Sequence, residues 1–243
     1  MNIVYAMTHH VYKWALPSMR SLAEHNPEAR VFILAEDDQL PFELPMPAEI
    51  INVSGQTYFP ETGVNYRNQY TYINLLKVRY PSLLPVQRVI HLDIDTIICD
   101  DLTEIWETDL TDKWVGAVPE YAGAYHPFGN MYYNMGVAVI NLGQMRADNI
   151  EGRMQEYLNK VPQPFADQDA WNKYGLAEDK FTQLNVRWNE GICTGMTDNP
   201  GIVHYVCFQD WWTNRQMQRV EYLDRYKAQQ DDGGKNEKAD QSG

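Results

Sequence analysis

Two aspartates separated by one residue, Asp93 and Asp95, interrupt an apolar segment of the 243-residue chain. The β-branched residues from Val89 onward predict a buried strand in a covered sheet. A buried carboxylate is costly, and a like charge nearby adds to the cost, so a cation must balance the pair. Side chains at positions i and i+2 of a strand share a face, about 6–7 Å apart at Cα. We therefore expect both aspartates to bind one divalent metal ion where this strand ends, at the edge where open α/β sheets bind ligands.

The flanking segments predict a wound α/β sheet that would hold this site. Apolar runs predict strands over residues 2–7, 31–35 and 49–53, with a helix over 12–24 between the first two. This β-α-β-β start favours a largely parallel sheet flanked by helices. Further strands are expected over 114–118, 131–140 and 201–206, and helices over 66–80 (ended by Pro81), 100–106, 147–160 and 167–174.

Composition limits the classes of function. The formal net charge of −13, without a visible stripe of Lys and Arg, argues against binding to nucleic acid. No apolar run approaches the roughly 18 residues of a membrane helix, and the start of the chain does not resemble a signal peptide. The three cysteines lack the spacing of a metal site, which favours reduced thiols and a cytoplasmic location.

The chain reads as one domain. No linker divides it, so residues 1–228 are expected to form a single unit. Residues 229–243 are polar, contain glycine and are almost free of apolar side chains, which predicts a disordered tail.

Six segments resemble, in the same order, the retaining glycosyltransferase family 8, the group of glycogenin and the bacterial lipopolysaccharide galactosyl- and glucosyltransferases. The resemblance runs from residue 2 to about residue 212. Its motifs are the first strand with Thr8 and Tyr12, the Pro-Ser-Leu-Leu-Pro connection after Lys77, the Asp-Ile-Asp of residues 93–95, Tyr-Asn-Met-Gly-Val at 133–137, Asp-Gln-Asp-Ala-Trp-Asn at 167–172, and His204-Tyr205.

The resemblance implies a single GT-A-type, Rossmann-like domain with a mainly parallel mixed sheet flanked by helices. It also implies a metal-dependent hexosyltransferase that retains the anomeric configuration. A hexose would pass from a nucleotide sugar, expected to be UDP-glucose or UDP-galactose, to a hydroxyl of a carbohydrate or glycan-type acceptor, in an α linkage. The metal would be Mn²⁺ or Mg²⁺, and its ligands would be Asp93, Asp95 and His204. A ligand set of two carboxylates and an imidazole suits Mn²⁺ better than Ca²⁺.

The same resemblance assigns roles around the donor. The donor-binding residues would be Thr8, Tyr12, Lys77, Asp93, Asn134 and Asp167, with Thr8 and Tyr12 on the uridine. The catalytic residues would be Gln168, whose amide oxygen can stabilise an oxocarbenium-like centre, and Asp167, which would orient the donor sugar. An aspartate at this position could instead simply cap the helix that follows.

One segment departs from the family pattern. Cys207 stands where the family has Gly, and Asp210 stands where it has a Lys that touches the diphosphate. An aspartate facing a diphosphate is repulsive. Either the loop is arranged differently, or Arg215 or Arg219 supplies the charge, or donor binding is weakened.

Two other functions remain open from the residues. A phosphatase of the haloacid dehalogenase type also uses Asp-x-Asp after an apolar strand, with Asp93 as nucleophile and Asp95 as acid and base. A non-catalytic sugar-nucleotide binder with the same fold would fit the aspartate at position 210.

Overall fold

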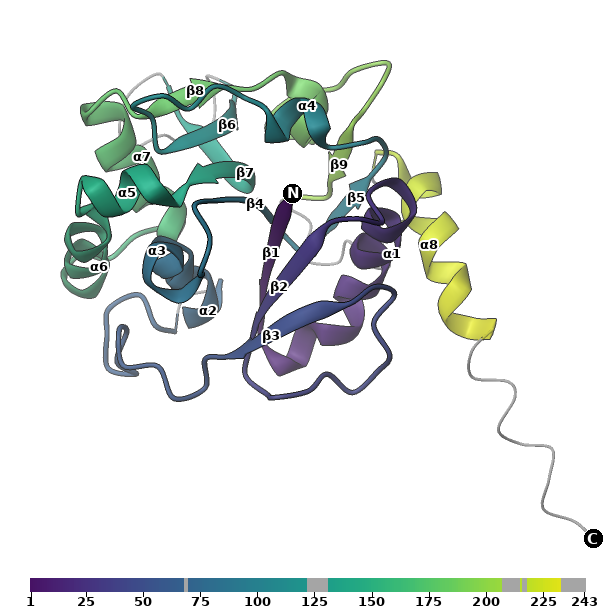
Figure 1. Ribbon diagram of the computed structural model, residues 1–243, viewed down its shortest axis with the longest axis horizontal. Coiled ribbons are helices and arrows are strands. Elements are labelled where there is room, and N and C mark those ends of the chain that lie inside the picture. The colour runs from purple at the N-terminus through teal and green to yellow at the C-terminus, as the bar shows by residue number, and fades with distance from the viewer. Residues whose placement is uncertain (68–69, 122–130, 207–214, 216–217, 233–243) are drawn as a thin grey trace, which may run out of the picture.

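The computed structural model describes residues 1–67, 70–121, 131–206, 215 and 218–232, with the backbone alone for 228–232. Its centre is a seven-stranded sheet of order β3-β2-β1-β4-β7-β6-β8 (Figure 1). The strands are β1 (Asn2–Met7), β2 (Arg30–Ala35), β3 (Ala48–Asn52), β4 (Arg88–Leu92), β6 (Val115–Pro119), β7 (Tyr133–Asn141) and β8 (Phe181–Gln183). Strand β7 is antiparallel to both of its neighbours, whereas the other pairs are parallel. The predicted mixed, mainly parallel α/β fold is confirmed.

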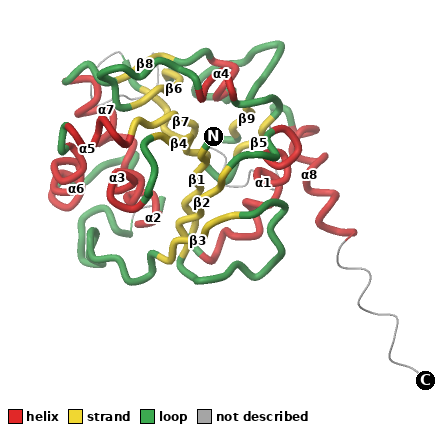
Figure 2. The backbone as a smooth tube through the Cα atoms, in the orientation of Figure 1, coloured by secondary structure: helices red, strands yellow, loops and turns green. Residues whose placement is uncertain are grey.

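Helices cover both faces of this sheet (Figure 2). They are α1 (Leu16–His25), α2 (Thr71–Leu75), α3 (Tyr80–Leu83), α4 (Thr103–Trp106), α5 (Leu142–Ala147), α6 (Ile150–Lys160), α7 (Asp167–Ala177) and α8 (Val220–Asp232), with 3-10 helices η1 (His9–Ala15), η2 (Leu76–Arg79) and η3 (Val186–Asn189). Because strand side chains alternate between faces, Val4 and Phe32 pack into one core cluster while Ile3 and Tyr5 pack into the other.

Prolines shift two of the predicted helices. The helix expected over residues 12–24 is a 3-10 segment followed by α1, which has Pro17 in its first turn. The helix expected over 66–80 is three short pieces, and Pro81 lies in the first turn of α3 instead of ending a helix. Proline lacks an N–H, which the first helical turn does not need, so it starts these helices.

The segment around the two aspartates is not one strand. Strand β4 ends at Leu92, and the next strand, β5 (Thr96–Ile98), belongs to a separate two-stranded sheet with β9 (Ile202–His204). The residues between β4 and β5 form a turn, so the prediction of a single strand through both aspartates is wrong. A strand that leaves one sheet for another needs such a break.

The C-terminal helix α8 packs on this small sheet. Leu223 and Tyr226 are buried together with Ile97, Val203 and Tyr205. Helix α8 extends to Asp232, so it includes residues 229–232 of the segment predicted to be disordered. The rest of that segment lies outside the described residues.

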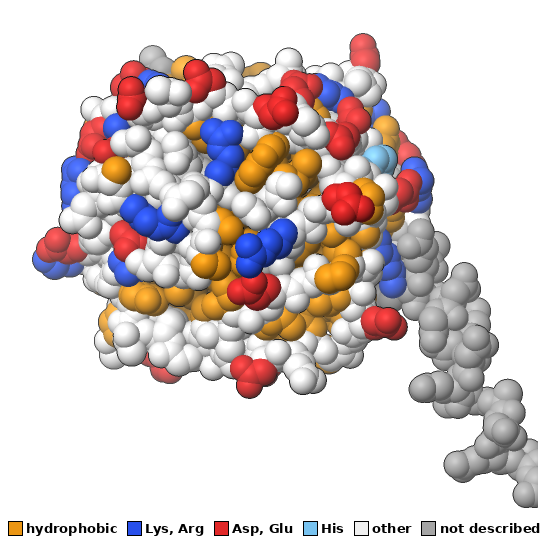
Figure 3. Space-filling model, in the orientation of Figure 1, with side chains coloured by type: hydrophobic (Ala, Val, Ile, Leu, Met, Phe, Trp, Pro, Cys, Tyr) orange, Lys and Arg blue, Asp and Glu red, His pale blue; other side chains and the backbone are white. Residues whose placement is uncertain are grey.

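The surface is mixed in charge on the face that Figure 3 shows. Lys and Arg side chains are dispersed among Asp and Glu there and do not form a stripe. Among the described helices, none is long and apolar enough to cross a membrane.

Candidate functional site

The turn after β4 brings Asp93, Asp95 and His204 together. One ligand atom from each lies within 4.8 Å of the others. The Nε2 atom of His204 is 3.3 Å from Oδ1 of Asp95 and 3.9 Å from Oδ2 of Asp93. The antiparallel register of β5 with β9, which pairs Thr96 with His204, sets this approach. The three predicted ligands therefore do lie together. A turn brings the two aspartates to the same place, and not their position on one face of a strand.

Gly136 provides the space for this cluster. A Cβ atom at this position would lie 2.1 Å from Cε1 of His204 and 2.8 Å from Oδ2 of Asp93. Its carbonyl oxygen also accepts a hydrogen bond of 2.8 Å from the backbone N–H of Asp93. Only a residue without a side chain fits where β7 passes this closely.

Asp93 uses its two oxygens differently. Oδ1 accepts hydrogen bonds from Nζ of Lys77 at 2.7 Å and from Nε2 of His91 at 2.9 Å, while Oδ2 faces His204. Burial opposes ionisation of Asp93, but Lys77 and His91 outweigh it and hold its pKa well below its usual range. Asp93 is thus an anion with one oxygen held by the protein and the other available to a cation.

Lys77 and His91 are both buried beside Asp93. His91 has a pKa lowered to about 4, mainly by burial, so it is neutral at pH 7. Its Nδ1 atom bonds to the Tyr80 hydroxyl at 3.0 Å, and Nε2 donates to Asp93. The sequence analysis gave His91 no role. His91 lies near the end of β4, two residues before Asp93. Since side chains two residues apart along a strand point to the same side, this spacing could have identified it.

His204 presents one ring nitrogen to the carboxylates. Its other nitrogen, Nδ1, lies 2.9 Å from Oδ1 of the buried Asn189. Burial would lower the pKa of His204, but the carboxylates of Asp95 and Asp93 raise it above its usual value. A proton on Nε2 and a metal ion would occupy the same place, so metal binding would displace that proton. Two carboxylates and one imidazole nitrogen in this cluster fit Mn²⁺ or Mg²⁺.

Asp167 is a buried carboxylate at the start of α7. It is 4% exposed, and within the described residues its Oδ2 has no hydrogen-bond partner. Burial raises its pKa from 3.8 to about 7, against the opposing charge of Lys77. The helix has Ala166 as its N-cap, with φ of +52°, and no side-chain cap. The alternative that Asp167 caps α7 is therefore wrong, and the unsatisfied oxygen points to a polar ligand.

Gln168 and Asn134 share one acceptor that the sequence analysis missed. Their side-chain NH₂ groups donate to Oε1 of Glu120, at 3.1 and 2.8 Å. The amide oxygen of Gln168 accepts from the backbone N–H of Met135 at 2.9 Å. Nothing local in the sequence indicates Glu120, because strand β6 meets β7 and α7 only in the folded chain.

Thr8 directly follows β1, and Tyr12 lies in the 3-10 helix η1 that comes next. Both are buried, and Tyr12 is 2% exposed with its hydroxyl accepting from the backbone N–H of Glu36 at 2.8 Å. Glu36 also accepts from the Tyr72 hydroxyl and from the backbone N–H of His9, at 2.9 and 2.8 Å. The contact of Thr8 and Tyr12 with uridine stays a prediction.

The two candidate replacement cations are already paired. Arg215 forms two hydrogen bonds to Asp224, and Nε of Arg219 lies 2.9 Å from the fully buried Glu190. Of the three alternatives, the one in which an arginine supplies charge to a diphosphate would require Arg215 or Arg219 to leave these carboxylates. Cys207 and Asp210 lie outside the described residues.

The fold is that of known glycosyltransferases. Two crystal structures of the galactosyltransferase LgtC, one of an active-site mutant and one of the complex with donor and acceptor sugar analogs, superpose with TM-scores of 0.76 and 0.71. Sequence identity is 19% and 20%, and each match covers 94% of this chain and 96% of LgtC. This likeness defines the GT-A fold.

The sequence comparisons identify the family. The profile described as "Glycosyl transferase family 8" matches residues 2–214. General stress protein A of Bacillus subtilis is 24% identical over 222 residues, which cover 79% of this chain and 74% of that protein. Glycosyltransferase GlyA of Streptococcus pneumoniae is 25% identical over 86% of this chain but only 32% of its own length. The chain belongs to glycosyl transferase family 8, as its motifs predicted, and the phosphatase alternative is wrong.

Proposed function

We propose that this glycosyltransferase moves a hexose from a UDP-sugar to an acceptor hydroxyl with retention of configuration, and that Asp93, Asp95 and His204 hold the Mn²⁺ or Mg²⁺ ion it needs. The cluster of these three side chains, oriented by buried neighbours, is the observation that carries the proposal. When bound, the ion supplies Lewis-acid stabilisation of the diphosphate leaving group.

The residues around the cluster suit the donor sugar. Asp167 has a free buried oxygen that can accept hydrogen bonds from sugar hydroxyls. Lys77 holds Asp93 in place and adds positive charge beside the diphosphate. The Gln168 amide, fixed at both ends, supplies an oxygen dipole to an oxocarbenium-like centre. In this scheme the bond from the anomeric carbon to UDP breaks while the acceptor oxygen bonds to the same face, and the acceptor proton passes to the leaving phosphate.

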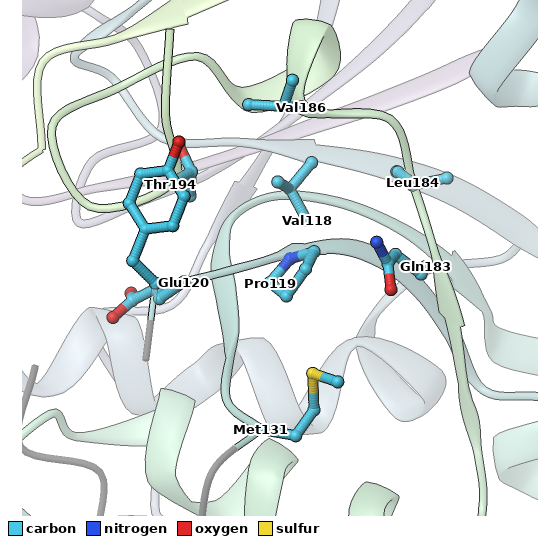
Figure 4. Close-up of a pocket in the computed structure, with 9 residues that line it drawn as sticks. Val118, Pro119, Glu120, Met131, Gln183, Leu184, Val186 and Thr194 are labelled. Carbon is cyan, nitrogen blue, oxygen red and sulfur yellow. The ribbon is translucent and has the colours of Figure 1, made fainter. Parts of the chain in front are cut away.

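A cavity lined in part by Glu120, the hydrogen-bond partner of Gln168, is the place we assign to the acceptor. It has a volume of about 470 Å³ and is lined by Val118, Pro119, Glu120, Tyr121, Met131, Gln183, Leu184, Val186 and Thr194 (Figure 4). Glu120 and Thr194 lie at one end of this cavity, and Gln183 and Leu184 at the other. Because Glu120 also accepts a hydrogen bond from Gln168, this residue links the cavity to the proposed catalytic amide.

The proposal is tested by incubating the protein with UDP-glucose or UDP-galactose, Mn²⁺ and a panel of glycoside acceptors. We expect an α-linked product, with the anomeric proton resolved by NMR, and slow donor hydrolysis without acceptor. Replacing the exposed Gln183, which also lines the cavity, with Trp should narrow the cavity and reduce transfer at least tenfold while leaving donor hydrolysis within twofold. A β-linked product would overturn the retaining mechanism. Binding of UDP with neither transfer nor hydrolysis would indicate the non-catalytic binder.

A further inference from the structure

Asn189, the last residue of η3, joins the proposed metal cluster to strand β7. Its side chain is fully buried, with Oδ1 lying 2.9 Å from Nδ1 of His204 and Nδ2 lying 2.9 Å from Oδ1 of Asn134. Its backbone carbonyl accepts a hydrogen bond from the hydroxyl of Thr194. Asn189 is therefore held from three sides, and one of its contacts is with the non-ligating nitrogen of a proposed metal ligand.

The direction of these hydrogen bonds follows from groups that cannot reverse. The backbone N–H of Gly136 can only donate, and it lies 3.0 Å from Oδ1 of Asn134. Asn134 therefore presents its oxygen on that side and donates its NH₂ to Glu120 on the other. Because the oxygen of Asn134 faces Asn189, Asn189 must present its NH₂ to it.

That orientation of Asn189 turns its amide oxygen toward His204. An amide oxygen accepts and cannot donate, so Nδ1 of His204 must carry the hydrogen. The neutral ring then has its lone pair on Nε2, the atom 3.3 Å from Asp95 and 3.9 Å from Asp93. The hydrogen bonds from the Gly136 N–H through the two asparagines thus leave Nε2 as the imidazole nitrogen with a lone pair.

We propose that Asn189 is a positioning residue that holds His204 in the Nδ1–H tautomer, with Nε2 directed at the carboxylates. The expected effect on metal affinity rests on the proposed function, whereas the assignment of the tautomer does not. Partners that fix the tautomer of a metal-ligating histidine typically change metal affinity by 10- to 100-fold when they are removed.

The first test is spectroscopic and uses the metal-free protein. In protein labelled with ¹⁵N-histidine, at an alkaline pH where the ring is neutral, the wild type should show a protonated Nδ1 and an unprotonated Nε2 for His204. Asn189→Leu, which keeps the size but removes the acceptor, should shift His204 toward the Nε2–H tautomer. Asn189→Asp retains an acceptor oxygen and should restore Nδ1–H. A wild-type spectrum with Nε2–H would overturn the proposal even if no variant folds.

The second test measures Mn²⁺ affinity by electron paramagnetic resonance in the presence of UDP. We expect Asn189→Leu to weaken Mn²⁺ binding 10- to 100-fold. The control is Asn65→Leu, at another buried asparagine, whose side chain bonds the backbone of Leu158 and Val161 far from the cluster. Its Mn²⁺ affinity should stay within twofold of the wild type. Equal losses in both variants would show a general effect of destabilisation and contradict the proposal.

The two tests separate this inference from the proposed function. If the wild type binds no Mn²⁺ but His204 has the Nδ1–H tautomer that depends on residue 189, the metal assignment fails and the tautomer assignment stands. If the wild type binds Mn²⁺ and the tautomer of His204 is the same in every variant at residue 189, the inference about Asn189 is wrong and the metal assignment stands.

Discussion

At the scale of single residues, Asp167 is a buried carboxyl group of the site whose charge is not balanced, within the described part of the chain, by hydrogen bonds to both oxygens. Its carboxylate is buried with one oxygen unpaired among the described residues. Burying an ionisable group without a partner lowers stability. Such groups are typical of functional sites, where a ligand pairs with the buried group. We therefore expect the Asp167 carboxylate to lower the stability of the fold while it contributes to donor binding.

We expect Asp167→Asn to change the dependence of stability on pH. The folded-state pKa is about 7 against an ordinary 3.8, so the folded state binds the proton more tightly. Its stabilising contribution is complete below pH 4 and is lost as pH rises toward 7. Residue 167 does not titrate in the variant. Between pH 4 and pH 8 the free energy of unfolding of the variant should therefore rise relative to that of the wild type by up to about 4 kcal/mol. Urea unfolding at several pH values measures this, and parallel curves for the two proteins would contradict it.

Gly136 offers a second residue-scale test. In Gly136→Ala the new methyl group would meet the ring of His204 at 2.1 Å. We expect the ring to be displaced, Mn²⁺-dependent UDP affinity to fall at least tenfold, and the free energy of unfolding to fall by about 1–3 kcal/mol. Gly152→Ala is the matched control, since a Cβ atom there meets nothing within 4 Å. An affinity unchanged in Gly136→Ala would mean that His204 is not a ligand.

At the scale of elements, the small sheet of β5 and β9 presents His204 to the turn after β4, and α8 covers that sheet. Tyr226 of α8 is 2% exposed and lies in the cluster with Val203, the neighbour of His204. We expect Tyr226→Ala to cost about 3–5 kcal/mol of stability, as for other large buried aromatic residues. Because β9 loses its support, Mn²⁺-dependent UDP affinity should fall as well. Thermal unfolding and calorimetry measure the two effects, and a loss of stability with unchanged affinity would show that α8 does not position His204.

Elements also show where sequence reasoning succeeds and where it stops. The first strands were predictable because their apolar runs are local. Asp93 and Asp95 were predicted as a metal pair from their spacing at the end of such a run, and His204 was predicted from motif resemblance. The break between β4 and β5 was not predictable, because the pairing of Thr96 with His204 joins residues over a hundred positions apart. The roles of Glu120 and Asn189 depend on the same kind of distant contact, and neither has a local signal.

At the scale of the whole molecule, an acidic chain has to hold an acidic donor. The net charge of −13 repels a nucleotide diphosphate at long range. The two arginines considered as substitutes are engaged with carboxylates, so Lys77 and a bound divalent ion would supply the attraction. We therefore expect UDP affinity to rise with added salt when Mn²⁺ is saturating, because screening weakens the long-range repulsion. Titrations at 20 and 200 mM NaCl measure this, and a tenfold fall in affinity at the higher salt would contradict it.

The most direct test of the central claim is calorimetric titration of UDP into the wild type and into Asp95→Asn, with and without Mn²⁺. We predict that Mn²⁺ strengthens UDP binding to the wild type at least tenfold and has no such effect on the variant, while both proteins unfold at similar temperatures. Equal strengthening by Mn²⁺ in the two proteins would contradict the assignment of Asp93, Asp95 and His204 as the metal site.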